Sequence, residues 1–451
     1  SLQVARLYIS EEFDEEMLAG TIGLKIEEGV SIIAIVGENM RRVPGISGRL
    51  YNTLGKNGIN VVAIAQGSSE LNISSVIRNT DLRKALNVIH EAFFLSGYKE
   101  INIYLAGIGT VGKDLLQQIS QQRESLMKDH RLKINLIGVM NSKKMLFDKS
   151  GLPFKNIREE LDSRGVPVNL KEFIREAERI NLRNSVFVDC SASADVADMY
   201  EGMMSAFISV VTANKIANSG KYSRYQTLQE MSRSRGLKFL YETNVGAGLP
   251  VIKTIDDLIL SGDKIVKLEA VLSGTLNFIF NTISEEVSMS HAIKMAKEKG
   301  YSEPDPRVDL SGVDVLRKIL ILARESGYPL EKEDVEVNTF LPESALNTKT
   351  LDDFWVEAEK LDADFEKRRK ALYAEGKRWR FVATLDGGKA SIGLQEVDAQ
   401  HPFFNLQGSD NILTLYTERY NAQPMVIKGA GAGAAVTASG VFADIVSVAN
   451  I

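Results

Sequence analysis

The order of apolar and polar positions first sets apart a small region at the start of the chain. Within residues 1–98, short apolar runs alternate with segments of helical spacing in the order β-α-β-β-α. The expected strands are Ser31–Val36, Asn60–Ala65 and Asn72–Arg78, and the expected helices are Ile46–Lys56 and Asp81 to about Phe94. A further strand would complete a β-α-β-β-α-β unit, and either Val4–Ile9 or Thr21–Ile26 could supply it. These residues are therefore predicted to form a separate α/β unit.

From residue 99 onward, apolar strands each lead into a helix. The first strand, Lys99–Ala106, runs directly into a glycine-rich turn and a helix expected from Val111 to about Arg123. The further strands expected here are Lys133–Val139, Ser185–Cys190, Phe207–Val211 and Phe239–Tyr241. Strands that alternate with helices predict a mostly parallel sheet with helices on its faces. Residues 99–245 are thus expected to form a nucleotide-binding domain of the Rossmann type.

After residue 245 the strands are longer and less regularly separated by helices. The expected strands are Ile265–Leu272, Arg380–Leu385, Ala390–Glu396, Asn411–Tyr416 and Pro424–Lys428, and the expected helices include Ser290–Lys299 and Leu351–Glu375. Asp386-Gly387-Gly388 lies between two of these strands and is a hairpin signal. We expect residues 246–428 to form an α+β domain within a chain of α/β class. Residues 429–451, which end in a helix of small residues at Val436–Val448, are assigned to the Rossmann domain.

The turn after the first Rossmann strand has the spacing of a dinucleotide-binding motif. Its residues are Gly107, Ile108, Gly109, Thr110, Val111 and Gly112. The first glycine permits a tight turn, the second lets the backbone approach a pyrophosphate, and the third permits close packing of the following helix. A purely structural glycine turn is the alternative. The position between a strand and a helix favours cofactor binding, because the motif requires that context.

Residues at the ends of neighbouring strands indicate which cofactor to expect. An NAD-specific site would place an acidic residue after the second strand, but Asn141 and Ser142 stand there, followed by Lys143 and Lys144. The two lysines could meet a 2′-phosphate or could form a solvated turn, so NADP is favoured and NAD is tolerated. The residues that follow the later strands, at the sheet edge where ligands bind, include Ser191, Ala192 and Lys215.

The run from Gly300 to Lys318, GYSEPDPRVDLSGVDVLRK, carries a high density of charge just before an apolar helix. Asp314 and Lys318 are four residues apart at the start of that helix, and buried charges are costly unless they are paired or used. One interpretation is structural, with Ser311 as the N-cap of a capping box and an i,i+4 ion pair. The other is a site for a small zwitterion, with carboxylates for its cation and a lysine beside them.

Composition narrows the classes of function. The 451 residues carry a net charge of −5 without a basic patch, so nucleic acid is not an expected partner. No apolar run approaches transmembrane length and no signal peptide is recognisable, so no membrane partner is expected. Cys190 is the single cysteine, which fits a reducing compartment and a cytoplasmic location. The four histidines show no ligand spacing, so a zinc site is not expected.

Part of the first region resembles an ACT domain, an amino-acid-sensing module. The resemblance rests on VPGISGRLYNTLGKNGINVVAIAQGSSELNIS, from Val43 to Ser74, with the turn Pro44-Gly45 where such modules hold an amino acid. The AQGSSE run, Ala65 to Glu70, is similar to the ACT unit of aspartate kinases. The resemblance makes Gln66 a candidate contact for a threonine effector. The alternative is that Gln66 merely ends a strand.

Three motifs in the remainder of the chain resemble homoserine dehydrogenase. They are TNVGAGLP (Thr243–Pro250), SGTLNFI (Ser273–Ile279) and the Gly300–Lys318 run. Together with the ACT-like region, the chain resembles the C-terminal part of a bifunctional aspartate kinase–homoserine dehydrogenase. The resemblance implies reduction of L-aspartate 4-semialdehyde to L-homoserine with NADPH or NADH, in threonine and methionine biosynthesis, by a homodimer or higher homo-oligomer. Another semialdehyde or amino-acid dehydrogenase and a threonine-sensing regulatory fragment are the rival interpretations.

The resemblance also assigns residues to roles. It implies Lys318 as the proton donor, Lys215 as a second active-site lysine, and Gly300 and Gly433 beside the cofactor. The implied substrate-binding residues are Glu303, Asp314, Thr275, Tyr301 and Asp309. The implied site for a monovalent cation such as Na⁺ consists of Glu242, Val245, Ala247 and Leu249. Lys215 could instead be a solvated helix-start lysine, and Glu242 a surface carboxylate. Val308 departs from a family pattern that often has Asp there, with Asp309 adjacent.

The chemistry of the residues agrees with this assignment. When hydride reaches an aldehyde carbon, negative charge builds up on its oxygen, and a lysine ammonium can stabilise that charge and deliver a proton. Carboxylates at Glu303 and Asp314 could hold the ammonium group of the substrate and orient it. Which of Lys215 and Lys318 donates the proton stays open at this point.

Overall fold

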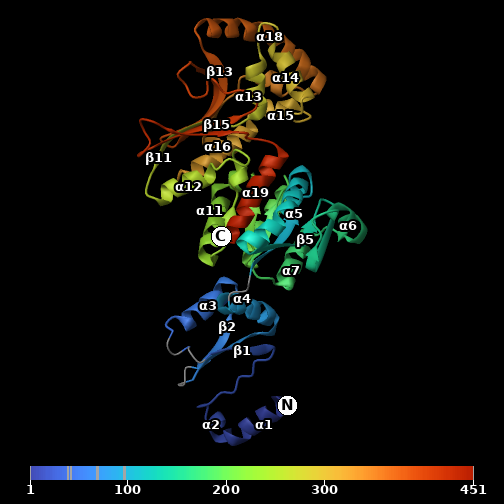
Figure 1. Ribbon diagram of the computed structural model, residues 1–451, viewed down its shortest axis with the longest axis vertical. Coiled ribbons are helices and arrows are strands. Elements are labelled where there is room, and N and C mark those ends of the chain that lie inside the picture. Colours follow the sequence, from blue (N-terminus) through green and yellow to red (C-terminus); the bar gives the residue numbers. More distant parts are fainter. Residues whose placement is uncertain (1, 38–39, 41–42, 68–70, 95–97, 450–451) are drawn as a thin grey trace. The chain divides into compact units, whose positions relative to one another are not determined.

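The computed structural model describes residues 2–37, 40, 43–67, 71–94 and 98–449 (Figure 1). The chain forms two compact units, Ser1–Ser96 and Gly97–Ile451. The α/β class expected from the sequence is confirmed by the three sheets of these units, one in the first and two in the second.

The first unit is a small antiparallel sheet with two helices packed against it. Its elements are α1 (Leu2–Glu12), α2 (Asp14–Leu18), β1 (Val30–Val36), α3 (Ile46–Lys56), β2 (Val61–Gln66), β3 (Asn72–Arg78) and α4 (Leu82–Phe94). The strands have the order β1-β3-β2. Ile33, Ile73 and Ile77 from the sheet meet Leu54 of α3 and Val88 of α4 in one core. The expected β-α-β-β-α order is therefore correct.

The expectation of a further strand from upstream is wrong. Val4–Ile9 lies inside α1, and Thr21–Ile26 forms neither helix nor strand. The apolar residues Val4, Leu7 and Tyr8 are spaced three and four apart, which is a helical rather than an alternating pattern. All three side chains are about half exposed or more, so this helix gains no burial from the sheet.

The second unit begins with a seven-stranded sheet of the doubly wound type. Its strands are β4 (Lys99–Ala106), β5 (Leu132–Met140), β6 (Lys144–Leu152), β7 (Val166–Pro167), β8 (Ser185–Asp189), β9 (Ser209–Thr212) and β10 (Phe239–Leu240). The order is β10-β9-β8-β4-β5-β6-β7, with β4, β5, β8, β9 and β10 parallel. The antiparallel strands β6 and β7 were not expected, because their residues do not alternate clearly.

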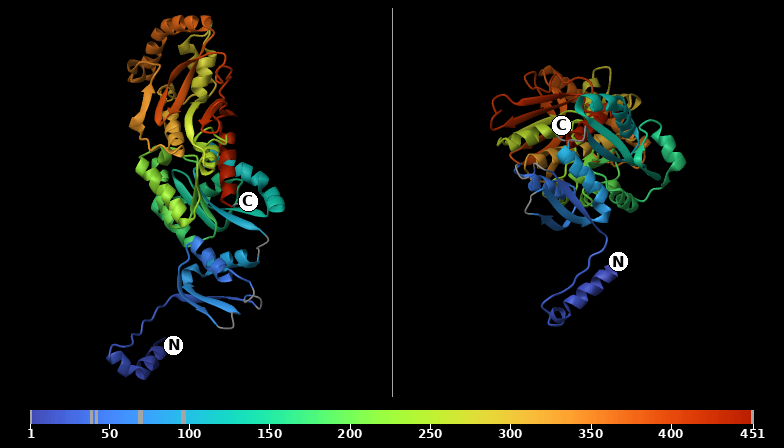
Figure 2. Two further views of the ribbon diagram at one scale, coloured as in Figure 1. Left: turned by 90° about the vertical axis from the view of Figure 1, so that its left-hand side faces the viewer. Right: turned by 60° about the horizontal axis from the view of Figure 1, so that its bottom comes forward.

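Helices cover both faces of this sheet. They are α5 (Thr110–His130), α6 (Ile157–Arg164), α7 (Leu170–Ile180), α8 (Ala194–Ala197), α9 (Tyr200–Ser205), α10 (Ile216–Ser219), α11 (Tyr222–Arg235) and, from the other end of the chain, α19 (Ala434–Val448). Ile103 and Leu105 of β4 pack with α5 and α19, whereas Tyr104 and Ala106 face the opposite cluster. The side-by-side position of α5 and α19 is visible in Figures 1 and 2. Helix α5 extends seven residues beyond the end expected from the sequence.

The remainder of the unit is built on a six-stranded sheet. Its strands are β11 (Ile265–Val271), β12 (Val335–Asn338), β13 (Arg378–Asp386), β14 (Lys389–Val397), β15 (Asn411–Thr417) and β16 (Met425–Gly429). The order is β12-β14-β13-β11-β15-β16. The expected hairpin between β13 and β14 is present, with Gly387 and Gly388 at φ of 54° and 85°, as a type I′ turn requires.

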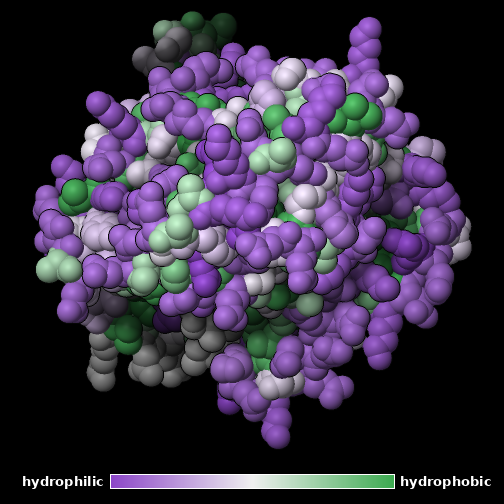
Figure 3. Space-filling model, turned by 90° about the horizontal axis from the view of Figure 1, so that it is seen from above, coloured by the Kyte–Doolittle hydropathy of each residue, from purple (hydrophilic) through white to green (hydrophobic). Residues whose placement is uncertain are grey.

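Helices pack against this second sheet either directly or through other helices. They are α12 (Ile252–Leu260), α13 (Gly274–Thr282), α14 (Met289–Glu298), α15 (Pro306–Leu310), α16 (Val313–Glu325), α17 (Glu343–Leu346) and α18 (Leu351–Ala374). Figure 3 shows the face that includes α18, where hydrophilic side chains predominate. This agrees with the many charged residues of α18, whose apolar side chains Phe354, Ala358 and Phe365 point into the core.

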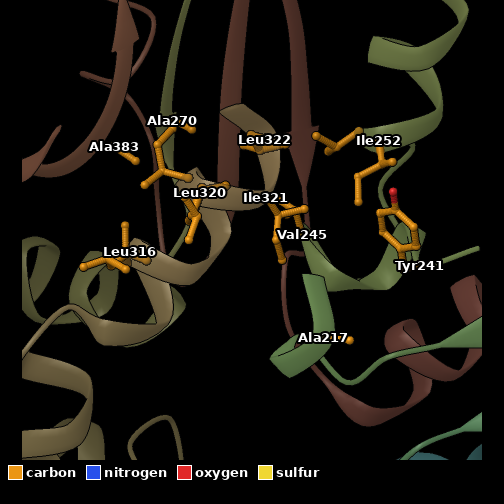
Figure 4. Close-up of a cluster of buried hydrophobic side chains, with 14 of the residues drawn as sticks. Ala217, Tyr241, Val245, Ile252, Ala270, Leu316, Leu320, Ile321, Leu322 and Ala383 are labelled. Atoms are coloured by element: carbon orange, nitrogen blue, oxygen red, sulfur yellow. The ribbon is translucent and has the colours of Figure 1, made fainter. Parts of the chain in front are cut away.

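Helix α16 connects the two halves of the second unit. Its side chains Leu316 and Leu320 lie near Ala270 and Ala383 of the six-stranded sheet (Figure 4). Ile321 of the same helix lies near Val245, on the side where Tyr241, Ile252 and Ala217 are found. A helix apolar on nearly every side is a buried helix, and the few charged side chains it carries need partners.

Candidate active site

The glycine turn after β4 has the geometry that the dinucleotide motif requires. Gly107 has φ of +89°, and a Cβ at that position would lie 3.0 Å from the backbone of Cys190. A Cβ at Gly112 would lie 2.0 Å from the Gly107 carbonyl oxygen. At Gly109, which is the N-cap of α5, a Cβ would meet no atom of the described residues within 4 Å. The first and third glycines are thus fixed by packing, and the second leaves the backbone open to a ligand.

The turn after β5 shows which of its polar residues are free to meet a ligand. The Asn141 side chain accepts hydrogen bonds from the backbone N–H groups of Lys143 and Lys144, both at 2.8 Å, and so shapes the turn itself. The Lys144 ammonium donates to the carbonyl oxygen of Asp162. Ser142 and Lys143 are exposed. Of the two lysines expected near a 2′-phosphate, Lys143 therefore remains available.

A buried polar network holds the loops after β8 and β9. Asp189 accepts hydrogen bonds from the Ser191 N–H at 2.7 Å and the Tyr200 hydroxyl at 2.7 Å. It also accepts one from the Asn214 side-chain amide at 3.1 Å. Burial raises the pKa of Asp189 above its ordinary value, although these donors oppose the rise. The network fixes the loop that contains Ser191 and Ala192 relative to the one that leads to Lys215.

Cys190 is the first residue after β8 and is partly buried. Burial raises its pKa well above the ordinary value, and the charge of Asp189 adds to the rise. A thiol that stays protonated is a poor nucleophile. Cys190 is therefore unsuited to act as a nucleophile.

Lys215 and Lys318 converge on one carboxylate. The Lys215 Nζ atom is 3.6 Å from Asp314 Oδ1, and the Lys318 Nζ atom is 2.8 Å from Asp314 Oδ2. Lys318 also donates a hydrogen bond of 2.7 Å to the Leu272 carbonyl oxygen, just after β11. The Lys318 side chain is only 10 % exposed, whereas Asp314 keeps 52 % of its surface accessible. The cluster is therefore anchored on the protein side and open on the other.

The charges of this cluster shift one another's pKa. For Asp314, surrounding protein atoms would raise the pKa, but the ammonium groups of Lys318 and Lys215 outweigh that effect and hold it well below the ordinary value. Burial lowers the pKa of Lys215, and the positive charge of Lys318 lowers it further, while Asp314 acts in the opposite direction. Asp314 is thus an anion at any ordinary pH, and Lys215 gives up its proton more readily than a solvated lysine.

A second group of expected substrate residues surrounds Thr275. The Thr275 hydroxyl donates to the Tyr301 carbonyl oxygen at 2.6 Å and lies 3.2 Å from Asp309 Oδ1. The other oxygen of Asp309 accepts the Glu303 N–H at 2.8 Å. The pKa of Asp309 is raised, first by burial and also by the nearby charge of Asp314, which places this group beside the lysine cluster.

Glu303 and Tyr301 present their side chains to solvent. The Glu303 side chain is exposed, and its backbone rather than its carboxylate is held by Asp309. Tyr301 is 45 % exposed and its ring lies 4.8 Å from the Phe278 ring. Gly300 has φ of +72°, and a Cβ there would meet no described atom within 4 Å. Glu303 and Asp314 were expected to act together, and in the structure the Glu303 carboxylate faces solvent while Asp314 binds the two lysines.

The expected capping box at Ser311 is wrong. Helix α16 begins at Val313 with Gly312 as its N-cap, in the left-handed region at φ of 73°. The Ser311 hydroxyl donates instead to the Val308 carbonyl oxygen at 2.7 Å, at the end of α15. Gly312 makes the sharp bend between the two helices, and Asp314 does not take part in a capping box. Its carboxylate is therefore able to bind the two lysines. The i,i+4 ion pair of Asp314 and Lys318 is present.

The residues expected around a monovalent cation form a tight turn. Glu242 begins a 3-10 helix, and its carboxylate accepts N–H groups of Ile252 at 2.7 Å and Lys253 at 2.8 Å, which caps α12. Val245 and Ala247 are buried, Leu249 is partly buried, and Ala247 has φ of +53°, which is unusual for a residue other than glycine. Across the described residues, no three His, Cys, Asp or Glu side chains gather as a polydentate metal cluster would.

Asp444 of α19 adds a second carboxyl group to this turn. Its Oδ2 atom accepts the Glu242 N–H at 3.0 Å. Burial raises the pKa of Asp444 to about 7, and the charge of Glu242 adds to the rise. Burial likewise raises the pKa of Glu242. A hard cation bound by oxygen atoms at this turn would relieve the repulsion, so the donor set fits such an ion.

The glycine-rich segment before α19, which includes Gly431 and Gly433, lies close to the carbonyl group that binds Lys318. A Cβ at Gly431 would lie 1.9 Å from the Asn411 side chain, and that side chain donates at 3.4 Å to the same Leu272 carbonyl oxygen that binds Lys318. Gly433, the N-cap of α19, has φ of +112°, and a Cβ there would meet no described atom within 4 Å. The glycine-rich segment thus passes close to the anchor of Lys318.

Family comparisons agree with this geometry. The family described as "Homoserine dehydrogenase" matches residues 250–446, and "Homoserine dehydrogenase, NAD binding domain" matches residues 107–242. A homoserine dehydrogenase from Schizosaccharomyces pombe is 35 % identical over 361 residues, which cover 77 % of this chain and 95 % of that protein. The chain belongs to the homoserine dehydrogenase family. An "ACT domain" model also matches residues 33–93.

Several relatives join homoserine dehydrogenase to a second enzyme. The bifunctional aspartokinase/homoserine dehydrogenase of Haemophilus influenzae is 38 % identical over 446 residues, which are 99 % of this chain but 54 % of that protein. A chloroplastic bifunctional protein of Zea mays is 39 % identical over 442 residues, 48 % of its length. The chain therefore spans about half the length of these bifunctional relatives.

Solved structures show the same fold in the second unit. A crystal structure of a protein of unknown function from Candida auris has a TM-score of 0.71 at 33 % identity and covers 78 % of this chain and 99 % of that one. A mutant hyperthermophilic archaeal homoserine dehydrogenase in complex with NADPH has a TM-score of 0.60 at 25 % identity, covering 78 % and 98 %. None of the helices in the described part of the chain has both the length and the apolar character needed to cross a bilayer.

Sequence reasoning missed several residues around the candidate site. The Leu272 carbonyl could not be found, because a backbone group has no sequence signal. Asp189 and Asn214 could have been noticed as polar residues at the ends of consecutive apolar strands. Asp444 lies two hundred residues from its partner Glu242 in a helix of small residues, and nothing local links the two.

Proposed function

We propose that the chain catalyses the reversible reduction of L-aspartate 4-semialdehyde to L-homoserine with a nicotinamide cofactor, preferentially NADP. The observation that carries the proposal is the pair of lysines on one shared carboxylate, Lys215 and Lys318 on Asp314, in a chain that also has a glycine turn open at Gly109. Family membership and the NADPH complex of the archaeal homoserine dehydrogenase support it. Purified protein with L-homoserine and NADP⁺ should show an absorbance rise at the nicotinamide wavelength. Its absence would contradict the proposal.

We assign cofactor binding to the sheet edge of the first half. The turn from Gly107 to Gly112, with Ile108, Gly109, Thr110 and Val111, would hold the pyrophosphate at the N-terminus of α5. Asn141, Ser142 and Lys143 would face the adenosine ribose, with Lys143 meeting a 2′-phosphate. Ser191, Ala192, Lys215, Gly300 and Gly433 would surround the nicotinamide half. The bound nicotinamide supplies a hydride for the aldehyde carbon or accepts it from the alcohol.

The two lysines would transfer the proton. Lys318 is fixed by Asp314 and by the Leu272 carbonyl oxygen, so its third N–H bond can point to the substrate oxygen. There it stabilises the developing negative charge and delivers a proton. Lys215 has a lowered pKa and faces the same carboxylate, which suits it to pass a proton to or from Lys318. We therefore assign the donor role to Lys318 and a supporting role to Lys215.

The substrate would be held by the surrounding acidic and hydroxyl groups. Asp314 keeps half of its surface accessible despite its two lysine partners, and the exposed Glu303 carboxylate can close over the substrate ammonium group. Thr275, Tyr301 and Asp309 would line the same pocket. Such fixed partners place the aldehyde carbon for hydride transfer. Glu303→Gln should raise KM for homoserine more than it lowers kcat, which is measurable by initial rates.

A monovalent cation such as Na⁺ would sit at the turn formed by Glu242, Val245, Ala247 and Leu249. One carboxylate and three backbone carbonyl oxygens are hard donors suited to such an ion, and Asp444 adds negative charge. The cation would fix the turn that leads from the nucleotide-binding sheet into α12. Activity in Na⁺ or K⁺ should exceed that in tetramethylammonium, and the melting temperature should rise with the same ions.

A second candidate function is threonine sensing, because residues 33–93 match an ACT domain. Gln66 ends β2, pairs with Ile73 of β3 and is exposed, so its side chain is accessible to an effector. Of the resemblance run from Ala65 to Glu70, residues 68–70 lie outside the described residues. Calorimetry with L-threonine on wild type and Gln66→Ala tests the role. No heat with wild type would contradict it.

We further propose that the enzyme is a homodimer or a higher homo-oligomer through the six-stranded sheet. Helices cover one face of that sheet. On the opposite face, the side chains of Lys267, Thr384 and Tyr416 are only partly buried. Light scattering after size exclusion gives the mass directly, and a monomer at micromolar concentration would contradict the proposal. The domain limits 1–98, 99–245 with 429–451, and 246–428, and a cytoplasmic location, remain predictions from the sequence.

A further inference from the structure

A large cavity lies away from the lysine cluster, between α11, α12 and the end of α16. Its volume is about 860 Å³. Its lining includes Tyr225 and Gln229 from α11, Asp256 from α12, and Glu325 and Ser326 from the end of α16. Cavities of this size between packed segments are where small ligands bind. The roles proposed for the dehydrogenase do not use any of these five residues.

Glu325 is the most unusual group in this cavity. Its Oε1 atom accepts two hydrogen bonds, from the Tyr225 hydroxyl at 2.9 Å and from the Tyr241 hydroxyl at 2.6 Å. Tyr241 in turn accepts a hydrogen bond from the Gln229 side chain. Among the described residues, no donor reaches the second oxygen, Oε2. The carboxyl group is therefore held rigidly through one oxygen while the other is left for a ligand.

The surroundings of Glu325 disfavour its negative charge. Burial raises the pKa of Glu325 to about 7, and the carboxylates of Asp256 and Glu242 add to the rise, while the two tyrosine hydroxyls oppose it. Arg324, next to Glu325, is already used, because its guanidinium donates to the carbonyl oxygens of Asn218 and Gly220, both at 2.7 Å. Within the described part of the chain, no basic side chain lies within ion-pairing distance of the Glu325 carboxyl group.

The rest of the lining is polar and incompletely paired. The Ser326 hydroxyl is buried, with the residue 8 % exposed, and has no hydrogen-bond partner within the described part of the chain. Asp256 is exposed on α12 and forms no ion pair with any of those residues. Lys264 and Arg233 also line the cavity. Unsatisfied buried polar atoms are uncommon in proteins, so an unpartnered hydroxyl and an unpartnered carboxyl oxygen in the lining of one cavity point to a ligand.

We propose that this cavity is a binding site for a small molecule that carries a primary ammonium group, with Glu325 as its counter-ion. The ammonium group would donate to Glu325 Oε2 and would lie near Asp256, whose charge it also balances. A cation there removes the like-charge repulsion between the two carboxyl groups. The apolar body of such a ligand would lie against Ile259, Leu260 and the Tyr225 ring, which line the same cavity.

The cavity lies next to elements that carry the active-site lysines, so binding there would affect how these elements are held. Glu325 ends the helix whose first turns carry Asp314 and Lys318, and Arg324 is hydrogen-bonded to carbonyl oxygens in and just after α10, the helix that follows Lys215. An occupant would contact α11 and α16 together. Helix α11 follows directly after α10, whose N-cap is Lys215, so the occupant would link α16 to the helix pair that begins at Lys215.

Calorimetry with n-propylammonium chloride tests the proposal on the full chain at pH 7. We expect a dissociation constant on the order of 1 mM for so small a ligand. Because Glu325 is partly protonated at this pH, binding should release roughly half a proton, seen as a heat that depends on the ionisation enthalpy of the buffer. Neutral n-propanol of the same size should release none. Equally strong binding of neutral n-propanol would overturn the role of Glu325 as a counter-ion.

Two variants locate the site. Glu325→Gln should abolish proton release and weaken binding at least tenfold, with homoserine oxidation retained as a check on folding. If Glu325→Gln does not fold, Asp256→Asn on the exposed face of α12 serves instead, and it should reduce both binding and proton release. Glu303→Gln, at the proposed substrate site, should leave both unchanged. If Glu303→Gln abolishes binding while Glu325→Gln or Asp256→Asn retains it, the measured heat comes from the substrate site and the proposal is overturned.

Discussion

Asp314 and Lys318 lie one turn apart on α16, and the Lys318 Nζ atom is 2.8 Å from Asp314 Oδ2. The acidic residue stands at the N-terminal side of the pair, where the helix dipole favours a negative charge. The pair is therefore stable as an element of α16 before any substrate arrives. Lys215, the N-cap of α10, joins the pair with its Nζ atom 3.6 Å from Asp314 Oδ1 and completes a group of three charges.

The first prediction concerns the proton donor. Lys318→Ala should lower kcat for homoserine oxidation by about 10²–10⁴-fold, because it removes the group that stabilises the developing charge and transfers the proton. The dissociation constant of NADP⁺, measured by fluorescence titration, should change little. Lys253→Ala is the matched control, since that lysine is exposed and pairs with Asp257. Loss of cofactor binding in Lys318→Ala would argue against the donor role.

The second prediction concerns the pH dependence of semialdehyde reduction. Asp314 supports the protonated form of Lys215, whose pKa is already lowered by burial. Asp314→Asn removes this favourable charge interaction, so the pKa of Lys215 falls further. The decline of kcat at alkaline pH should then begin at a lower pH. Initial rates between pH 6 and pH 10 measure the limb. Asp257→Asn is the control, and an unchanged or alkaline-shifted limb in Asp314→Asn would contradict the coupling.

The third prediction separates two glycines of one turn. Gly112→Ala places a Cβ 2.0 Å from the Gly107 carbonyl oxygen, so it should lower the free energy of unfolding by about 3 kcal/mol and abolish NADP⁺ binding. Gly109→Ala finds free space in the described structure and should keep the melting temperature while weakening NADP⁺ binding, because the methyl group occupies the approach to the pyrophosphate. Equal melting temperatures for both variants would contradict this division.

The fourth prediction concerns Asp444, whose pKa is raised to about 7 by burial. An unfolded aspartate titrates near 4, so between these pH values the folded state binds more protons, and this group lowers stability as the pH rises. Asp444→Asn should thus have the same melting temperature as wild type near pH 4. At pH 8, without alkali cations, it should be more stable by about 2 kcal/mol, half of the upper bound set by the shift.

The control for this experiment is Asp257→Asn on exposed α12, which should show no pH-dependent gain. Adding Na⁺ should reduce the advantage of Asp444→Asn, since a bound cation relieves the repulsion between Asp444 and Glu242 in the wild type. A variant less stable than wild type at pH 8 in the absence of alkali cations would show that Asp444 is not under electrostatic strain.

The local parts of the fold could be predicted because their causes are local. The turn from Gly107 to Gly112 follows a strand and precedes a helix in sequence as in space, and the β13–β14 hairpin depends on two adjacent glycines. Ser311 was misinterpreted because a serine three residues before an aspartate is a capping signal. Gly312 overrides that signal by taking the left-handed conformation at the start of α16.

The site itself could be predicted only through the family resemblance. The contact joins Lys215, the N-cap of α10, to Asp314 of α16, about a hundred positions apart, and no periodicity encodes it. The role of Glu325 was also hidden, because an Arg-Glu-Ser sequence at a helix end looks like a solvated terminus. Its burial depends on Tyr225 and Tyr241, which belong to other segments.

The position of α19 beside α5 has a consequence for how the protein is made. The Gln118 side chain donates to the Ala435 carbonyl oxygen, and Lys99 at the start of β4 donates to that of Ala449. Ribosomes synthesise the chain from its N-terminus. Helix α19 therefore cannot pack on the nucleotide-binding sheet until all the residues between α5 and α19 have been synthesised. Until then its apolar face stays uncovered in the nascent chain, and chaperones that shield exposed hydrophobic surface gain a long interval in which to act.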